Sequence, residues 1–394
     1  MTICASVGTS RLRNSALAGQ EAARQARARQ GPGSPRLVLL FATIGYDASA
    51  LLERVQAEFP GVPLLGCSAE GTIAEGWSDE SPFSVLVLAL GGDLEVETGC
   101  VTGLQADSFR AGTRIAEQVG ARRRSSSRLL LLFPDGITLN ATRFLQALAS
   151  LAPLPVFGGA AGDNWKLSRS WQCLDDRVLT DGAVWALLSG DFAVCSAFNH
   201  GCVPIGEELT VTRSEGNRIQ AINGRPVIEF LQDYMLVHPA GGQSSTLNIA
   251  IGFAAPGFFQ EHDRDYEFLI THLVLTEEQR QGGFITVLPE LPAGTRIWLV
   301  RRDPEVMHRR VDDLAVALQR SLAGRTPGVV LHFDCSGRGR AVFREEQIHA
   351  HLRRLQEQTG VGLPWGGFYT YGELASVGGV PCFHNYTAAL VALV

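Results

Sequence analysis

Three segments of the chain repeat one pattern, and this repetition limits the possible folds more than any other feature. Each segment has an apolar run, a turn, a predicted helix, and then a proline followed three residues later by a glycine. The three sets are residues 37–41 with Pro63 and Gly66, residues 129–133 with Pro155 and Gly158, and residues 329–333 with Pro364 and Gly367. The first two sets have identical spacing, and the third is about nine residues longer.

Each segment predicts a βαβ crossover whose second strand ends in glycines. In α/β proteins built from such crossovers, ligands bind beyond the carboxyl ends of the strands. We therefore expect an α/β fold with two related halves, in which repeated βαβ units form mixed sheets covered by helices. A helix at about residues 14–30 precedes the first unit. Residues 238–257 are rich in Gly, Ser, Ala and Pro, which places the boundary between halves 1–237 and 238–394.

Composition and charge exclude several classes of function. The 394 residues are 45% hydrophobic and carry a net charge of −6, with a pI near 5.9. This charge argues against general binding to nucleic acid or anionic lipid. No apolar run approaches the roughly 18 residues of a membrane span, and no secretory signal is evident. We expect a cytoplasmic protein with no nucleic-acid partner and no membrane association.

The eight cysteines are scattered, without any CxxC pair. This excludes zinc ribbons, thioredoxin-like redox sites and covalently attached c-type haem, and no metal site is predicted. No kinase or cyclase module is recognisable either. The chain is therefore expected to bind or sense a ligand and to leave the output to another protein.

Several blocks of the sequence resemble the FIST sensory domain, a bacterial signal-transduction family with N-terminal and C-terminal halves. In the N-terminal half they are residues 65–71 (LGCSAEG), 157–163 (FGGAAGD), 181–184 (DGAV), 203–206 (VPIG), 210–212 (TVT) and 223–226 (NGRP). In the C-terminal half they are residues 335–339 (CSGRG), 366–373 (GGFYTYGE) and 384–387 (HNYT). Residues 238–266 depart from the family pattern, because they lack its Pro-Leu and Arg-Asp-Pro run.

The resemblance implies a cytoplasmic input domain that binds a small ligand, such as an amino acid, and acts on a histidine kinase or a cyclic-di-nucleotide enzyme. Some members of the family bind haem and sense nitric oxide, which gives the leading alternative function. Neither function requires catalysis, so the chain is not expected to be an enzyme.

Three polar residues alternate after the last repeated glycine. Tyr369, Tyr371 and Glu373 follow a strand-like period, so their side chains are expected to share one face. Two phenols and a carboxylate on one face suit recognition of an amine or hydroxyl group. In the alternative interpretation, residues 371–373 form a structural turn in which Glu373 accepts backbone hydrogen bonds.

A second candidate lies in the loop after the first strand of the third segment. Arg338, between two glycines and close to Cys335, can clamp a carboxylate or phosphate. With Glu373 holding an amine, it would favour an amino-acid-like zwitterion. The alternative is a glycine-rich turn with a solvated arginine.

The block at 384–387 adds His384 and Asn385 to the candidate ligand-binding residues. Cys335 and His384 also allow a distant alternative, a hydrolase with a thiol nucleophile and an imidazole base. A buried thiol at the end of a strand is favoured over this catalytic pair.

A haem ligand requires one histidine in an apolar pocket. The candidates are His238 beside the glycine-rich stretch, His200 near Cys202, and His332 on an otherwise apolar strand. For each, a surface position or a hydrogen-bonded core position is the favoured alternative, and no cofactor is the primary expectation.

Overall fold

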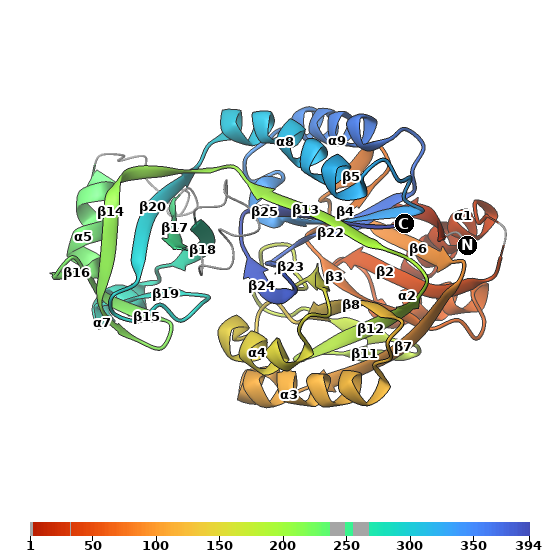
Figure 1. Ribbon diagram of the computed structural model, residues 1–394, viewed down its shortest axis with the longest axis horizontal. Coiled ribbons are helices and arrows are strands. Elements are labelled where there is room, and N and C mark those ends of the chain that lie inside the picture. Colours follow the sequence, from red (N-terminus) through yellow and green to blue (C-terminus); the bar gives the residue numbers. More distant parts are fainter. Residues whose placement is uncertain (1–2, 32, 237–248, 255–267) are drawn as a thin grey trace.

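The computed structural model describes residues 3–31, 33–236, 249–254 and 268–394. The predicted α/β class, with mixed sheets covered by helices, is confirmed (Figure 1). Each repeated segment forms a βαβ crossover in which the two strands pair in parallel. None of the described helices is long and apolar enough to span a membrane.

The crossovers belong to three larger units with the same order of elements. The first unit contains β1 (Cys4–Ser10), α1 (Ser15–Ala28), β2 (Pro35–Thr43), α2 (Ala48–Glu58), β3 (Leu64–Ala69), β4 (Gly71–Ala74), β5 (Trp77–Asp79) and β6 (Val85–Gly91). The second contains β7 (Leu94–Thr102), α3 (Leu104–Arg122), β8 (Ser127–Pro134), α4 (Ala141–Leu148), the 3₁₀ turn η1 (Ala149–Leu151), β9 (Val156–Gly159), β10 (Gln172–Leu174), β11 (Arg177–Leu179) and β12 (Gly182–Gly190).

The third unit is split by a long insertion after its first strand. It contains β13 (Val194–His200), α8 (Pro304–Leu322), β21 (Val329–Cys335), the 3₁₀ turn η3 (Ser336–Arg338), α9 (Glu345–Thr359), β22 (Trp365–Thr370), β23 (Glu373–Val377), β24 (Val380–His384) and β25 (Thr387–Leu393). Apart from the 3₁₀ turns, the order of helices and strands matches that of the first two units.

Each unit contributes a hairpin to the sheet of a neighbouring unit. The first sheet has the order β1-β6-β2-β3-β10-β11, the second β7-β12-β8-β9-β23-β24, and the third β13-β25-β21-β22-β4-β5. The hairpin β4–β5 of the first unit thus completes the third sheet, β10–β11 completes the first, and β23–β24 completes the second. This cyclic exchange joins the three units in a threefold arrangement.

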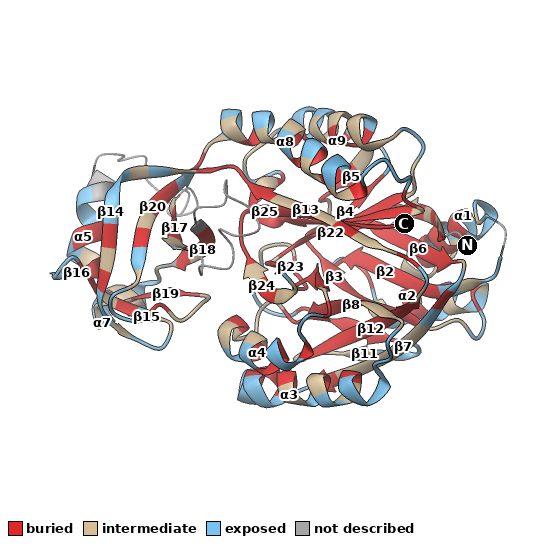
Figure 2. Ribbon diagram, in the orientation of Figure 1, coloured by how far each residue is buried: buried red, intermediate tan, exposed pale blue. Residues whose placement is uncertain are grey.

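Alternate residues of the central strands face two different cores. In β2, Leu39 and Phe41 point into a core shared by the three sheets, whereas Leu40 packs against α1 and α2. Helices α3 and α4 cover the second sheet in the same way, and α8 and α9 cover the third. Figure 2 shows the buried strands at the centre and the exposed outer faces of the helices. In the shared core, neighbouring rings have centroids 4.5–6.0 Å apart, among Phe41, Phe133, Phe333 and Phe368.

The insertion, residues 202–303, forms a separate sheet at one end of the molecule (Figure 1). Its elements are β14 (Cys202–Glu215), β15 (Arg218–Ile222), β16 (Arg225–Pro226), α5 (Val227–Leu236), β17 (Ile249–Ala254), β18 (Phe268–Val274), α7 (Glu277–Gly282), β19 (Ile285–Val287) and β20 (Arg296–Arg302). The chain leaves the core along β14 and returns along β20, with which β14 pairs. The boundary expected between residues 237 and 238 lies outside the described residues and stays a prediction.

Candidate functional site

The glycine-rich ends of the three units meet at one place. There each chain segment leaves its own sheet for that of its neighbour, and backbone hydrogen bonds between equivalent positions close a ring. These bonds run from Glu70 N to Tyr369 O (3.0 Å), from Gly162 N to Ser68 O (3.1 Å) and from Tyr371 N to Ala160 O (3.0 Å). The ends of the three repeated strands therefore lie together, and these backbone groups hydrogen-bond to each other.

Side chains from the three units reinforce this ring. The hydroxyl of Tyr371 donates to Asp163 Oδ1 at 2.7 Å, and the Trp165 N–H donates to Glu70 Oε1 at 2.8 Å. Burial raises the pKa of the Glu70 carboxyl above its usual value, against the hydrogen bonds that lower it. These side chains link the three units. Glu70 of the first unit accepts a hydrogen bond from the second, and Asp163 of the second unit accepts one from the third.

A strained loop follows Asp163. Asn164, Trp165 and Leu167 have positive φ values of 57°, 60° and 50°, which is uncommon for residues other than glycine. The Asp163 carboxylate stabilises this conformation by accepting hydrogen bonds from the backbone N–H groups of Leu167, Ser168 and Arg169. Such strain persists only where the surroundings impose it.

The prediction that Tyr369, Tyr371 and Glu373 share one face is wrong. The chain leaves the third sheet at Thr370 and enters the second at Glu373, so the period-two rule does not apply across this segment. Tyr369 is buried against α8 and α9, and Tyr371 contacts Asp163. The Glu373 carboxylate accepts hydrogen bonds from the Thr370 hydroxyl (2.5 Å) and the Thr387 N–H (3.2 Å), as in the alternative interpretation of a structural turn.

Arg338 is buried in an ion pair with Asp334. Its Nε donates to Asp334 Oδ1 at 2.8 Å, and its side chain is 8% exposed. On the other side of Asp334, His332 Nε2 lies 3.4 Å from Oδ2, and Trp365 Nε1 donates to His332 Nδ1 at 3.3 Å. Burial alone would raise the pKa of the Asp334 carboxyl, but Arg338 and His332 hold it below its usual value. The predicted ligand anchor thus already has a carboxylate partner within the protein.

Cys335 and His384 do not have the properties of a catalytic pair. Burial raises the pKa of the Cys335 thiol well above its usual value, which opposes formation of the thiolate nucleophile. Burial lowers the pKa of His384 to about 4, and its Nε2 lies 3.1 Å from the carbonyl oxygen of Ala375. Asn385 Oδ1 accepts a hydrogen bond from His272 N (3.1 Å) and so connects the core to the inserted sheet.

Two of the three haem-ligand candidates, His332 and His200, lie within the described residues. Both ring nitrogens of His332 face protein groups, so His332 does not fit an iron ligand. His200 is buried, and its Nδ1 accepts a hydrogen bond from Cys202 N at 3.2 Å. His238 lies outside the described residues, so the expectation of no cofactor and the alternative of a haem both stay untested predictions.

Glu80 is a buried carboxyl that closes the loop after η3. Its Oε1 accepts a hydrogen bond from Arg340 N, and its backbone carbonyl accepts one from Arg340 Nη1, each at 2.7 Å. Burial outweighs the attraction of the Arg340 guanidinium, which lies 3.8 Å away, and raises the pKa of Glu80 from 4.5 to about 8.

This raised pKa predicts a loss of stability with rising pH. Between pH 4.5 and 8 the folded protein holds a proton that the unfolded chain releases, so the free energy of unfolding falls as pH increases. Glu80→Gln keeps the acceptor for Arg340 N but cannot titrate. We expect its free energy of unfolding to fall by a few kcal/mol less than that of the wild type as the pH rises. Urea unfolding at pH 5, 6.5 and 8 measures the free energy of unfolding of both proteins. The exposed control Glu117→Gln keeps the wild-type slope, and an unchanged slope in Glu80→Gln would contradict the assignment.

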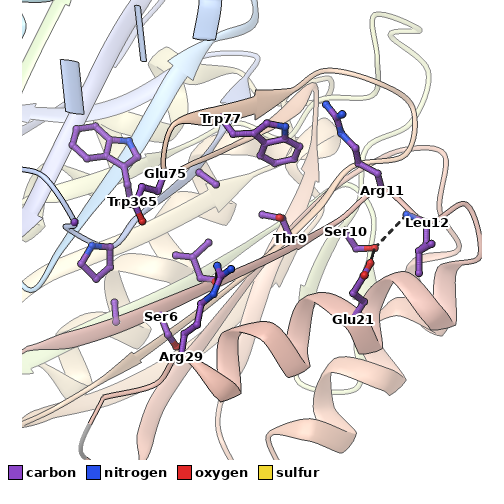
Figure 3. Close-up of a pocket in the computed structure, with 15 residues that line it drawn as sticks. Ser6, Thr9, Ser10, Arg11, Leu12, Glu21, Arg29, Glu75, Trp77 and Trp365 are labelled. Carbon is purple, nitrogen blue, oxygen red and sulfur yellow. Dashed lines mark hydrogen bonds between the residues drawn. The ribbon is translucent and has the colours of Figure 1, made fainter. Parts of the chain in front are cut away.

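A groove of about 850 Å³ lies between the first and third sheets. One wall is formed by β1, an edge strand, with Glu21 and Arg29 from the α1 region, and the other by the β4–β5 hairpin and residues 362–365. Figure 3 shows the guanidinium of Arg29 and the carboxylate of Glu75 extending into the same space from opposite walls. Ligand pockets commonly measure about 300–1,000 Å³, so the groove has a suitable size.

The charged groups of the groove differ in what they contact. Arg11 donates from Nε to Asp79 Oδ2 at 2.5 Å, and its guanidinium lies 5.0 Å from the centre of the Trp77 ring. Arg29 donates from Nη1 to the Val7 carbonyl at 3.1 Å. Within the described ranges neither Arg29 nor Glu75 forms an ion pair. Arg29 and Glu75 are therefore available to a ligand, whereas Glu21, which also forms no ion pair among the described residues, accepts a hydrogen bond from the Ser10 hydroxyl.

None of the ligand-binding residues predicted from the sequence lines this groove. Its walls come from residues 5–12, 74–77 and 362–365 together with Glu21 and Arg29, and no motif connects these segments. The nearest signal in the sequence is the third repeat, since Pro364 belongs to it and lines the groove.

Comparisons with known proteins agree with the resemblance of the sequence blocks. The family model of the FIST N domain matches residues 36–225, and that of the FIST C domain matches residues 228–376. An uncharacterized protein of Mycobacterium tuberculosis is 29% identical over 402 residues, covering 98% of this chain and 99% of that protein. An uncharacterized protein of Mycobacterium bovis is 27% identical over 390 residues, covering 96% and 95%.

Two further matches, to a protein of another organism and to a solved structure, are more distant. An uncharacterized protein of Methanocaldococcus jannaschii is 24% identical over 183 residues, covering 43% of this chain and 35% of that protein. The crystal structure of a chorismatase covers 100% of this chain and 99% of its own, at 9% identity and a TM-score of 0.34. A likeness this weak supports no inference about fold or activity.

Proposed function

Because the chain belongs to the FIST family, whose domains are sensory domains of signal transduction, we propose that it senses a small zwitterionic ligand bound in the groove between its first and third sheets. The observation that carries this proposal is the position of Arg29 and Glu75 on opposite walls of one groove. Neither residue forms an ion pair in the described part of the chain. An amino acid carries the complementary charges on adjacent groups.

The groove supplies the interactions that such a ligand requires. The guanidinium of Arg29 retains N–H donors for a carboxylate, a geometry in which arginine is effective. The Glu75 carboxylate can accept hydrogen bonds from an ammonium group. Trp77 offers an aromatic surface for the apolar part of the ligand. Its ring is in contact with the Arg11 guanidinium.

Signal output is proposed to occur through contact with a partner protein in the cytoplasm. The family suggests a histidine kinase or a cyclic-di-nucleotide enzyme as this partner. The groove lies between two units that share β4–β5, so a ligand that draws its walls together changes the relative positions of the first and third sheets. A partner that contacts both units would detect this change.

A thermal-shift screen of the amino acids, followed by calorimetric titration of each hit, tests the proposal. We expect Arg29→Ala or Glu75→Gln to weaken binding of a hit by at least about tenfold, because a hydrogen bond to a charged group contributes roughly 1.5–3 kcal/mol. The controls are Arg114→Ala and Glu117→Gln, which alter exposed residues on α3, outside the groove. A hit whose affinity is the same in all four variants would place the ligand elsewhere.

A further inference from the structure

A second pocket, of about 320 Å³, lies where the inserted sheet meets the core. Helix α4 and strand β24 form the core side of this pocket, and β17, β18 and Pro289 form the side of the insertion. Hydrogen bonds join the same two parts of the molecule, among them those from His272 N to Asn385 Oδ1 (3.1 Å) and from Glu290 N to Thr142 Oγ1 (2.9 Å). The pocket is thus built by two parts that are already in contact.

None of the described residues that line this pocket carries a charged side chain. Phe253, Leu269 and Ile270 face it from the insertion, and Leu145 and Phe383 from the core. The polar groups that reach it are largely engaged, since Asn385 Oδ1 and Thr142 Oγ1 form the hydrogen bonds just described. Because a charged ligand would lose its hydration without gaining a partner among these residues, they disfavour ions and zwitterions.

Cys382 adds to the apolar character of the lining. Burial raises the pKa of its thiol to about 12, and Sγ lies 3.4 Å from the Val380 carbonyl. At neutral pH it is therefore a protonated thiol, which behaves as a small apolar group. Val380, Phe253 and Leu269 belong to the same apolar cluster as Cys382, which extends from the insertion to the core.

We propose that this pocket binds an uncharged aromatic molecule, so that the protein has an apolar ligand site distinct from the charged groove. Its volume is roughly twice that of an apolar cavity of about 150 Å³ that takes up benzene, which suits a ligand of about ten to twelve carbon atoms. The two phenylalanines suit a ring, since aromatic pairs add to the gain from burial. A ligand here contacts the insertion and the core together and therefore stabilises their docked arrangement.

The test uses 2-naphthol as the probe, with the full chain in calorimetric titration and thermal shift. We expect one saturable site, a raised melting temperature, and at least tenfold weaker binding in Leu145→Trp, whose larger side chain fills the pocket. The matched control is Leu17→Trp, because Leu17 is 54% exposed on α1 and contacts neither pocket wall. Binding that does not saturate, or that is equal in the two tryptophan variants, overturns the proposal.

A second variant keeps the test valid if Leu145→Trp does not fold. Gln146 lines the same pocket and is exposed, so Gln146→Glu retains the fold and places a carboxylate at the rim. It is expected to weaken 2-naphthol binding several-fold, and unchanged affinity contradicts the site. Arg29→Ala and Glu75→Gln should leave 2-naphthol binding unchanged. A loss of binding in those variants would place the probe in the groove and refute the second site.

Discussion

Alanine in place of Gly66, Gly158 or Gly367 is expected to destabilise the fold by about 3 kcal/mol or more in each case, at the upper end of the cost of overpacking a core. These glycines occupy equivalent positions in the three units. An added Cβ would lie 1.7 Å, 2.0 Å and 1.8 Å, respectively, from a backbone carbonyl oxygen of the neighbouring parallel strand. Real Cβ contacts are essentially never shorter than 3.0 Å, and a backbone atom cannot rotate away as a side chain can.

Gly120 is the matched control for these three substitutions. It lies within α3, and a Cβ added there meets no atom within 4 Å. Because alanine has the higher helix propensity, Gly120→Ala is expected to stabilise the protein by about 0.5–1 kcal/mol. Urea unfolding followed by circular dichroism measures all four variants. Wild-type stability in any of the three strand variants would show that the neighbouring strand can move aside, and the explanation of the repeat would fail there.

The same close approach explains why the repeat was visible in the sequence. The oxygens that exclude a Cβ belong to Leu40, Leu132 and His332, each one residue before a phenylalanine of the shared core. The glycine and the apolar run are therefore two local requirements of one strand pair. Local requirements of this kind leave a pattern in the sequence. The three crossovers could be predicted for this reason.

The exchange of hairpins among the sheets left no such pattern. Glu70 N bonds to Tyr369 O across almost 300 residues, and nothing local to either residue specifies this pairing. The chain changes sheets between Thr370 and Glu373, which is why the alternation of two tyrosines and a glutamate was misread as one strand face. Strand β1 was not predicted either, because the sequence CASVGTS is short and rich in small and polar residues.

The two pockets could not be predicted from the sequence, for a related reason. The charged groove combines Arg29 with Glu75, and the apolar pocket combines Leu145 with Phe253 and Phe383. These residues come together only through the arrangement of sheets and the docking of the insertion. Asn385, chosen from its sequence block, does line the apolar pocket, but as part of the contact between core and insertion. Its role as a ligand contact stays a prediction.

Arg338 was predicted to anchor a ligand, and its surroundings predict a different result when it is removed. In the first two units, Leu40 and Leu132 occupy the position of His332 and pack against the covering helices. In the third unit this position holds a histidine, which is followed by Asp334 and then Arg338. The polar replacement is stable because each group has a partner, in the order Trp365, His332, Asp334, Arg338. Removing one member leaves the next buried without its counterpart.

Arg338→Ala is therefore expected to cost about 3–5 kcal/mol of stability at neutral pH, the usual effect of removing one partner from a buried ion pair. Since the folded-state pKa of Asp334 lies below its usual value, this contribution is present above about pH 4 and is lost in more acidic solution. Unfolding in urea at pH 7 and pH 3 measures the difference. Arg309→Ala on the exposed face of α8 is the control, expected to change stability by less than about 0.5 kcal/mol.

The double variant Asp334→Leu/Arg338→Met should be more stable than Arg338→Ala, because no unpaired charge remains buried. If Arg338→Ala instead unfolds at the same urea concentration as the wild type, the ion pair does not contribute to stability. That result would favour the original prediction that Arg338 anchors a ligand.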